Sequence, residues 1–428
     1  MPLDTEIVKA EIARFYLESR DFNGIPFGEL LRRTDSSAEQ LTGVLQELIR
    51  NEIVGLLGLE GGNSHIVLLG FSDVDTQIGS LACADANHTC LYLRRPYLNE
   101  YVPPDLYATL PYKRAMALGE PQLSFRSFDL HVLEDYRNDP RYRYRNFDLS
   151  GDICIRDEFF ECEQVAEADK ILLSTFGFSF DQDMNRAVAV FLRYLADLSA
   201  EHQRMWHARE LNGEYALHPD YFESKIMGSW DTGVSACDAI LAEMRLINKM
   251  AAAMGREPLF TESFGEYGER KPAEFAFLLR PTNHEYQSFI LVLDRMLSDN
   301  LNRRFFANDV PYEREIVQAD GRIRVEQKGT LAILDEWLRA HFEVENWNPW
   351  DTAIATLREV RRLRQGPAHR LDDNHFDTSI FTQQQALLER VYSAVRALRI
   401  LLSHDEMVLS ADIAIDRFLV TGDKIRFQ

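Results

Sequence analysis

The chain is poor in several residue types and patterns that would define its class. It has five cysteines in 428 residues, scattered and without a C-x-x-C pair, which is typical of a reducing compartment. No apolar run approaches the roughly 20 residues that span a bilayer. The first residues, MPLDTEIVKAE, carry acids where a secretory signal has basic and then apolar residues. We therefore expect a cytoplasmic protein without a membrane segment.

Positive charge is also scarce. The net charge is −21 and the sequence pI is about 5.0, so the surface as a whole repels phosphate backbones. The cations are 39 arginines and only 8 lysines, a bias that genomic base composition explains more simply than selection for phosphate binding. Any contact with nucleic acid must be local, and we do not expect DNA as a partner.

The common catalytic signatures are absent. The sequence contains no G-x-G-x-x-G, no Walker lysine loop, no H-E-x-x-H and no G-x-S-x-G, which argues against the common nucleotide-binding, metalloprotease and hydrolase classes. Cys83, His88 and Cys90 come closest to a zinc site, but their spacing matches no usual knuckle and no fourth ligand is near in sequence. We expect no metal and no cofactor.

The composition is that of a folded, multidomain protein, with 46% hydrophobic and 27% charged residues. The fold class that we predict is mainly α. We expect four domains: an N-terminal module of helices and a hairpin at 1–75, a mixed α+β region at 76–180, a helical scaffold at 181–325, and a helical bundle with a short β-like tail at 326–428.

The N-terminal module is predicted from three amphipathic segments followed by two apolar runs. The segments lie at 5–19, 26–33 and 34–53, and the apolar runs within 53–71 indicate a hairpin turning at 60–63. Three helices and a hairpin resemble a generic winged helix. The third segment carries Glu39 and Glu47 against Arg50, which favours packing or dimerisation over DNA binding.

Helical periodicity dominates the rest of the chain. From about 181 onward, Val188, Phe191, Leu192 and Leu195 form an apolar stripe at helical spacing. Further helices are expected at 234–254, 283–304, 331–342, 348–364 and 382–403, with a hairpin turning at 320–321.

One stretch of the C-terminal bundle, RRLRQGPAHRLDDN at 361–374, stands out in so acidic a chain. On a helical wheel, Arg364 continues the apolar stripe of Ala353, Leu357 and Val360. An arginine in that place must reach out of the core, pair with an acid, or serve a site at a subunit seam. His369 follows five residues later.

The pair Arg364 and His369 resembles the motif of the HEPN family, whose nuclease members carry Arg, four to six residues and then His before the last helix of a small bundle. Here the gap is four, Gln365 supplies the polar residue after the Arg, and Ala368 supplies the small residue before the His. The resemblance covers roughly 330–405. It implies metal-independent RNA cleavage at a dimer interface.

By this resemblance His369 is the acid/base, Arg364 clamps the scissile phosphate, and Gln365 assists. An RNA-binding rim is expected from the surrounding arginines, which are Arg358, Arg361, Arg362 and Arg370. Other Arg-x4-His spacings occur at Arg126, Arg370 and Arg399, and arginines in the last turn of a helix also simply complement its dipole.

The function that we predict is an HEPN-type endoribonuclease, a phage-defence or toxin effector of bacteria. It is expected to act as a homodimer or a higher homo-oligomer under the control of a protein activator or inhibitor. The alternative is a non-catalytic assembly or regulatory protein that uses both modules for dimerisation and partner binding.

Overall fold

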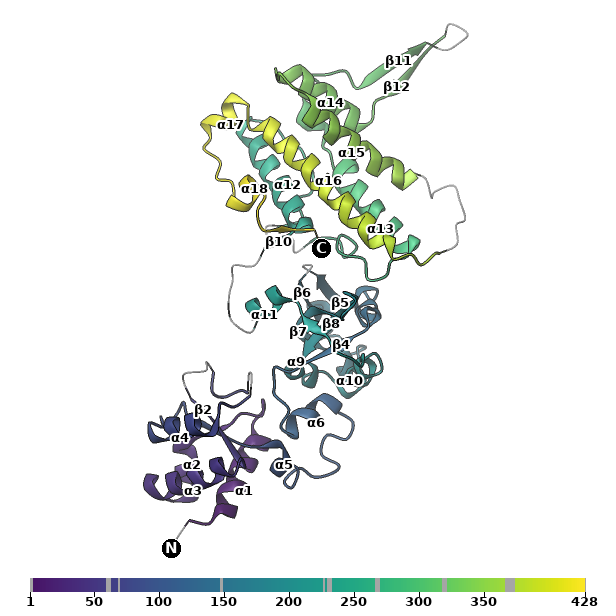
Figure 1. Ribbon diagram of the computed structural model, residues 1–428. Coiled ribbons are helices and arrows are strands. Elements are labelled where there is room, and N and C mark those ends of the chain that lie inside the picture. Colours follow the sequence, from purple (N-terminus) through teal and green to yellow (C-terminus); the bar gives the residue numbers. More distant parts are fainter. Residues whose placement is uncertain are drawn as a thin grey trace. The chain divides into compact units, whose positions relative to one another are not determined.

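The computed structural model describes residues 3–58, 63–67, 70–146, 149–225, 228, 233–265, 270–317, 322–365 and 374–427. About 49% of the protein is helical and 15% is strand, so the expected mainly-α class is correct at that level. The chain forms two compact units, Met1–Arg145 with Ser150–Gly228, and Asn146–Leu149 with Ser229–Gln428 (Figure 1).

The first unit begins with the three expected helices, α1 (Thr5–Glu18), α2 (Phe27–Thr34) and α3 (Ala38–Arg50). A capping box starts α3: the Ser37 side chain accepts from the Gln40 amide, and the Gln40 side chain accepts from the Ser37 amide. Leu41, Leu45 and Leu48 then bury one face of the helix.

The strand that follows α3 does not pair as predicted. β2 (Val54–Leu57) is antiparallel to β3 (Cys90–Leu93), with β1 (Ile25–Pro26) on the other side of β3. The expected turn at 60–63 lies mostly outside the described residues, and 63–67 contains no strand. The partner predicted for β2 was the second apolar run within 53–71, and this prediction was wrong. The observed partner, β3, is buried at all four positions and lies beyond the helix α4 (Val74–Ala82) in sequence.

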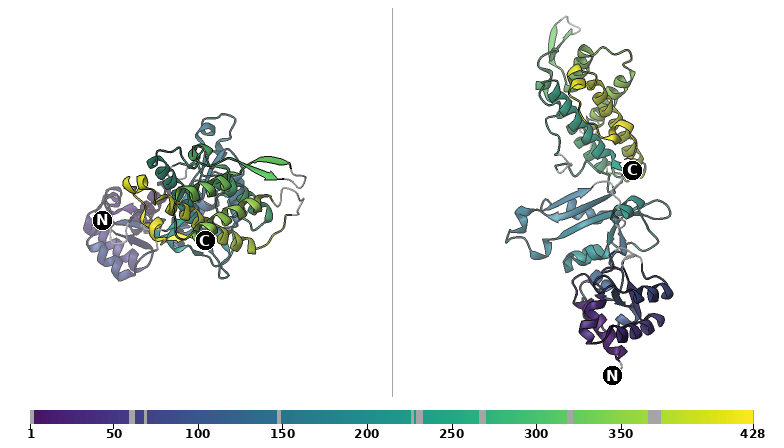
Figure 2. Two further views of the ribbon diagram at one scale, coloured as in Figure 1. Left: turned by 90° about the horizontal axis from the view of Figure 1, so that it is seen from above. Right: turned by 90° about the vertical axis from the view of Figure 1, so that its left-hand side faces the viewer.

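A six-stranded sheet and a set of short helices form the rest of the first unit (Figure 2). The order of the sheet is β4-β8-β7-β6-β5, with β9 also paired to β7. The strands are β4 (Phe125–Phe128), β5 (Tyr142–Asn146), β6 (Ser150–Ile155), β7 (Leu172–Phe180), β8 (Arg186–Phe191) and β9 (Ala216–Leu217). The short helices of this region are α5 (Arg95–Leu98), α6 (Pro111–Ala117), α7 (Glu134–Arg137), α8 (Asp157–Phe160), α9 (Leu192–Ala196), α10 (Ala200–His207) and α11 (Pro219–Lys225), with 3-10 turns at Leu130–Leu133 and Glu167–Asp169.

The helix expected from 181 onward is a strand in its first part. Residues 186–191 form β8, whose last five residues are buried between β4 and β7. A short, continuous apolar run fits a buried strand as well as a buried helix, and periodicity alone does not separate them. The boundary expected between 180 and 181 therefore falls between paired strands of one sheet, and the structure divides the chain after Gly228 instead.

Aromatic side chains fill the core beside this sheet. Trp206 Nε1 donates to the Tyr136 hydroxyl at 2.8 Å, and that hydroxyl lies 2.7 Å from His202 Nδ1. Phe128 meets Trp206 edge to face, with ring centroids 4.9 Å apart. Burial lowers the pKa of His202. His202 is thus a core residue.

The second unit is a helical bundle. Its helices are α12 (Ala236–Ala253), α13 (Asn283–Asp294), α14 (Thr330–His341), α15 (Asn348–Gln365), α16 (Ser379–Leu402), α17 (Glu406–Ser410) and α18 (Arg417–Thr421), with a π-helical turn at Arg295–Asp299 and a 3-10 turn at Arg303–Phe306. α16 packs against both α12 and α15, and α13 packs against α15 (Figure 1). The strands are β10 (Val234–Ser235), β11 (Glu313–Val317), β12 (Ile323–Gln327) and β13 (Ile425–Arg426).

Two predictions for this unit need correction. The tail expected to be β-like forms the helix α18 and only a two-residue strand, β13, which runs parallel to β10. The boundary expected between 325 and 326 falls inside β12. Side chains of α12 and α13 share one hydrophobic core with those of α14 to α16, so the predicted scaffold and bundle meet in a single core.

Candidate functional site

The predicted site lies at the C-terminal end of α15 and just beyond it. Arg358, Arg361, Arg362, Arg364 and Gln365 all belong to this helix, whereas His369 and Arg370 lie outside the described residues. The helix places its arginines by the same period that buries its apolar side chains.

Arg364 continues the buried stripe of α15. Ala353, Leu357 and Val360 are buried at spacings of three and four, and Arg364 follows Val360 at the next such position. That position faces α13, which packs against α15. Because it lies in the last turn, the arginine side chain can leave the apolar core and meet polar groups at the end of α13.

Two carboxylates hold the Arg364 guanidinium. Its Nη1 donates to Asp294 Oδ2 at 2.7 Å and to Asp299 Oδ2 at 2.6 Å. Asp294 is fully buried and Asp299 is 44% exposed, while the Arg364 side chain is 32% exposed. The hydrogen bonds that Arg364 donates, to Asp294 first and then to Asp299, raise the pKa of Arg364. Arg364 was expected to reach out of the core, to pair with an acid, or to serve a site between subunits. The structure shows that it pairs with acids.

Both of these hydrogen bonds use the same nitrogen. Within the described part of the chain, neither Nε nor Nη2 of Arg364 has a partner. A guanidinium presents five N–H donors in a planar fork that matches carboxylate and phosphate oxygens. The two carboxylates therefore fix the plane of the guanidinium at Nη1 and leave one edge of the fork open.

The carboxylates sit at a distortion of the helix backbone. Residues Arg295–Asp299 form a π-helical turn directly after α13, and such turns occur frequently at functional sites. The Asp294 Oδ1 and Ser298 Oγ atoms are buried without a hydrogen-bond partner. An unsatisfied buried polar atom costs about 1–3 kcal/mol.

Sequence reasoning did not identify Asp294, Ser298 or Asp299. A signal was present, because Asp294 interrupts the strongly apolar run SFILVLDRML, and a charge inside such a run is rarely buried without a partner. The partner, however, lies 70 residues further along the chain. No local pattern connects the two.

The arginines expected to bind RNA differ in their contacts. Arg358 donates to Asp335 Oδ2 at 2.9 Å, and Asp335 also accepts from Trp350 and Arg339. Burial alone would raise the pKa of Asp335, but these three hydrogen bonds together lower it. Arg358 therefore joins α15 to α14 through Asp335, while its side chain stays 52% exposed.

Arg362 is exposed and Arg361 is half-buried. Within the described residues neither forms an ion pair. Arg362 lines an open groove of about 810 Å³ together with Arg358, Arg390 and Glu359. Arg390 is paired with Glu359, so Arg362 is the cation of this groove that remains available to an anion.

The other Arg-x4-His spacings are structural where the chain is described. Arg399 is buried, and its Nε donates to Glu243 Oε2 at 2.8 Å. Arg126 pairs with Glu120 and Glu210. For the remaining pair, Arg370 with His375, the arginine lies outside the described residues.

The zinc interpretation of Cys83, His88 and Cys90 has no structural support. Cys83 is exposed and Cys90 is buried, and His88 bonds to Asp85. Across the described ranges, no three His, Cys, Asp or Glu side chains gather closely enough to hold a metal ion.

No described helix is long and apolar enough to cross a membrane.

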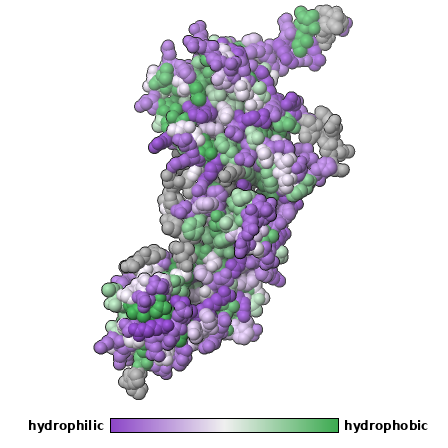
Figure 3. Space-filling model, viewed as in Figure 1, coloured by the Kyte–Doolittle hydropathy of each residue, from purple (hydrophilic) through white to green (hydrophobic). Residues whose placement is uncertain are grey.

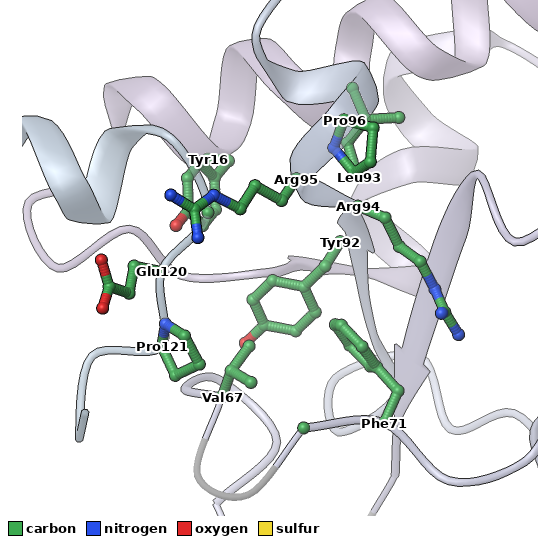
Figure 4. A pocket seen from close by; sticks show the side chains of 12 residues that line it. Tyr16, Val67, Phe71, Tyr92, Leu93, Arg94, Arg95, Pro96, Glu120 and Pro121 are labelled. Atoms are coloured by element: carbon green, nitrogen blue, oxygen red, sulfur yellow. The ribbon is translucent and has the colours of Figure 1, made fainter. Parts of the chain in front are cut away.

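The first unit contains a smaller hollow of about 240 Å³ (Figure 4). Tyr16, Phe71 and Tyr92 line it, and Arg95 extends at its edge toward Tyr16 (Figure 4). The Tyr16 hydroxyl donates to the Met116 carbonyl and the Tyr92 hydroxyl to the Ser64 carbonyl. Since these hydroxyls are already bonded, the hollow offers a mostly apolar lining.

Comparison with family models, with curated proteins and with solved structures found no match to this chain.

Proposed function

We propose that the protein is a metal-independent endoribonuclease of the HEPN type, with Arg364, Gln365 and His369 at its active site. The observation that carries the proposal is the state of Arg364. Its guanidinium is held through Nη1 by Asp294 and Asp299, and its Nε and Nη2 have no partner among the described residues. His369 follows five residues later.

The chemistry requires a proton to move and a phosphate to be held. In the proposed reaction the ribose 2′-oxygen attacks the adjacent phosphorus, the bond to the 5′-oxygen breaks, and a 2′,3′-cyclic phosphate and a 5′-hydroxyl form. His369 takes the 2′-proton or gives one to the 5′-oxygen, and water carries the other of these two protons; the histidine contributes roughly 10² to 10⁴ in rate. The open edge of Arg364 donates to the phosphate oxygens, and Gln365 assists.

The two carboxylates give this arginine a fixed geometry, and they also oppose the binding of an anion. Arg364, Asp294 and Asp299 carry a formal charge of −1 between them, so RNA binding must draw on further cations. Arg361, Arg362 and Arg370 are the candidates. We therefore expect RNA binding to be weak and strongly dependent on salt.

We also propose a biological role for this activity. The winged-helix-like arrangement at the N-terminus and the bundle at the C-terminus fit a defence or toxin effector of bacteria, active as a dimer and released by a protein partner. This placement rests on analogy of domain order. The acidic α3, with Glu39 and Glu47, favours assembly over DNA reading for the N-terminal helices.

A second candidate function has one observation in its favour. The contact of Arg364 with the buried Asp294 joins α13 to α15, which is also what a purely structural arginine would do. In that case the protein is a non-catalytic assembly protein, and RNA is not its substrate.

Cleavage of total RNA, tRNA and an end-labelled oligonucleotide in EDTA separates the two candidates. We expect the wild type to leave 2′,3′-cyclic phosphate ends, and His369→Ala and Arg364→Lys to lose cleavage while remaining folded. Lysine keeps the charge but not the fork. The matched control is His404→Ala, because Arg399 and His404 have the same spacing but Arg399 is paired with Glu243.

The assembly candidate predicts that no RNA in this set is cut by the wild type. It also predicts that expression of the wild type and of His369→Ala affects growth equally, with and without phage.

A further inference from the structure

The strands β11 and β12 form a hairpin that projects from the helical unit (Figure 1). They pair with each other and, within the described residues, with no other strand. The base of the hairpin is closed by a hydrogen bond from the Lys328 amide to the Tyr312 carbonyl at 2.8 Å. The outer edge of each strand is therefore open to a further strand.

One face of this hairpin carries exposed apolar side chains toward its outer end, beside Glu315, which lies opposite Val325. Val317 lies opposite Ile323 in the antiparallel register, and Val325 lies two residues further on the same face. These residues are 71%, 60% and 55% exposed, and the space-filling view shows a hydrophobic patch near the end of the projection (Figure 3). A two-stranded hairpin alone is marginally stable in water, so the exposed strand edge and apolar face indicate an interaction surface.

The sequence of β12 is complementary to itself. The strand reads Ile323-Arg324-Val325-Glu326-Gln327. If two copies pair antiparallel with Val325 opposite Val325, each Arg324 lies opposite Glu326 of the other copy. Opposite charges at directly facing positions stabilise a strand pair, and so do paired β-branched residues.

The outer edge of β11 lacks this property. The strand reads Glu313-Arg314-Glu315-Ile316-Val317, so the same antiparallel pairing about its centre places Glu315 opposite Glu315. Like charges at facing positions destabilise a strand pair. The pattern thus favours one edge of the hairpin over the other.

We propose that the protein forms a twofold homodimer by antiparallel pairing of β12 with β12 of a second copy, centred on Val325. The product is a four-stranded sheet in the order β11-β12-β12-β11. Val317, Ile323 and Val325 of both copies then lie on one face of a continuous sheet. Each Arg324, whose Nε lies 3.3 Å from Glu326 Oε1 of its own strand, bonds to Glu326 of the other copy instead. This dimer does not depend on the proposed ribonuclease activity.

Charge reversal tests the pairing. Arg324→Glu places two glutamates opposite each other at both facing positions. Glu326→Arg places two arginines there, and it is made together with Arg314→Glu so that the facing pair within its own hairpin keeps opposite charges. Each variant alone should weaken the dimer about tenfold or more. A mixture of the two variants restores opposite charges at both positions, so it should form heterodimers with about wild-type affinity.

Association of the full chain is measured by sedimentation velocity over micromolar concentrations, and heterodimers of the mixture by native mass spectrometry. Glu313→Arg is the matched control, because Glu313 lies on β11 opposite the neutral Gln327 of its own hairpin and does not face the second copy. This control should remain dimeric. Val325→Cys adds a second measurement, since mild oxidation should link the two copies at that position, whereas Glu315→Cys on β11 should not link.

Three results would overturn the proposal. They are a monomeric wild type, a dimer that neither reversal weakens, and reversals that weaken the dimer without rescue on mixing. The last result would assign the hairpin to another occupant, such as a strand of a different protein. RNA cleavage by the same variants is scored separately, so loss of the dimer and absence of nuclease activity remain distinguishable.

Discussion

Replacing Arg364 with alanine should destabilise the helical unit far more than replacing its neighbour Arg362. Asp294 is fully buried, and Arg364 is its only partner in the described part of the chain. Removing one partner of a buried ion pair costs about 3–5 kcal/mol, because the charge left behind is uncompensated. Asp299 is 44% exposed and remains hydrated, so it adds little to the loss.

The effect is measurable as a shift in melting temperature. For a unit of this size, each kcal/mol lowers Tm by about 2–4 °C, so Arg364→Ala should lower the Tm of the helical unit by about 6–20 °C. Trp337 and Trp350 are buried in this unit and report its melting by fluorescence. Arg362→Ala removes an exposed side chain and should lower Tm by less than about 2 °C.

A second substitution checks the cause. Asp294→Asn in the Arg364→Ala background leaves a neutral group in place of the isolated charge, and it should recover part of the lost stability. Equal melting temperatures for Arg364→Ala and Arg362→Ala would refute the reasoning. In that event Arg364 is not a fixed guanidinium, and the basis of the proposed site is lost.

The remaining predictions concern single side chains. The fold lowers the pKa of Asp335, so the charged carboxylate stabilises the protein above the ordinary aspartate pKa. This stabilisation is lost as pH falls below that pKa. The Tm difference between the wild type and Asp335→Asn should therefore narrow below about pH 4. Ser298→Ala removes a buried hydroxyl without a partner, so the free energy of unfolding in urea should stay unchanged or rise by up to about 1 kcal/mol. A clear decrease in this free energy would show that the hydroxyl is bonded. At Gly151 a Cβ would overlap the Arg145 carbonyl and the Phe176 ring, so Gly151→Ala should cost about 1–3 kcal/mol in urea unfolding of the first unit; a neutral result would contradict the close packing of β6 on its neighbours.

The helices could be predicted because their signals are local. The capping box of Ser37 and Gln40 and the apolar stripe of α15 are complete within a few turns of sequence. Strand pairing has no such signal. β2 pairs with β3 across the whole of α4, and β8 has the same continuous apolar character as a buried helix.

The candidate site was predicted in part for the same reason. The position of Arg364 at the end of a buried stripe follows from helical period, and so does the need for a partner or an exit. The identity of that partner does not follow, since Asp294 and Asp299 lie 70 and 65 residues away. Which of the arginines are ion-paired also depends on tertiary contacts, because Arg358 bonds to Asp335 of another helix.

The measurement that tests the central claim most directly compares RNA cleavage rates of His369→Ala and His404→Ala with that of the wild type, in EDTA and at low salt. If His369 is the acid/base, its loss should slow cleavage roughly 10² to 10⁴-fold, whereas the matched control should stay within about twofold of the wild type. If folded wild-type protein cuts no RNA in the tested set, or if both variants cut as fast as the wild type, the proposed ribonuclease function is contradicted.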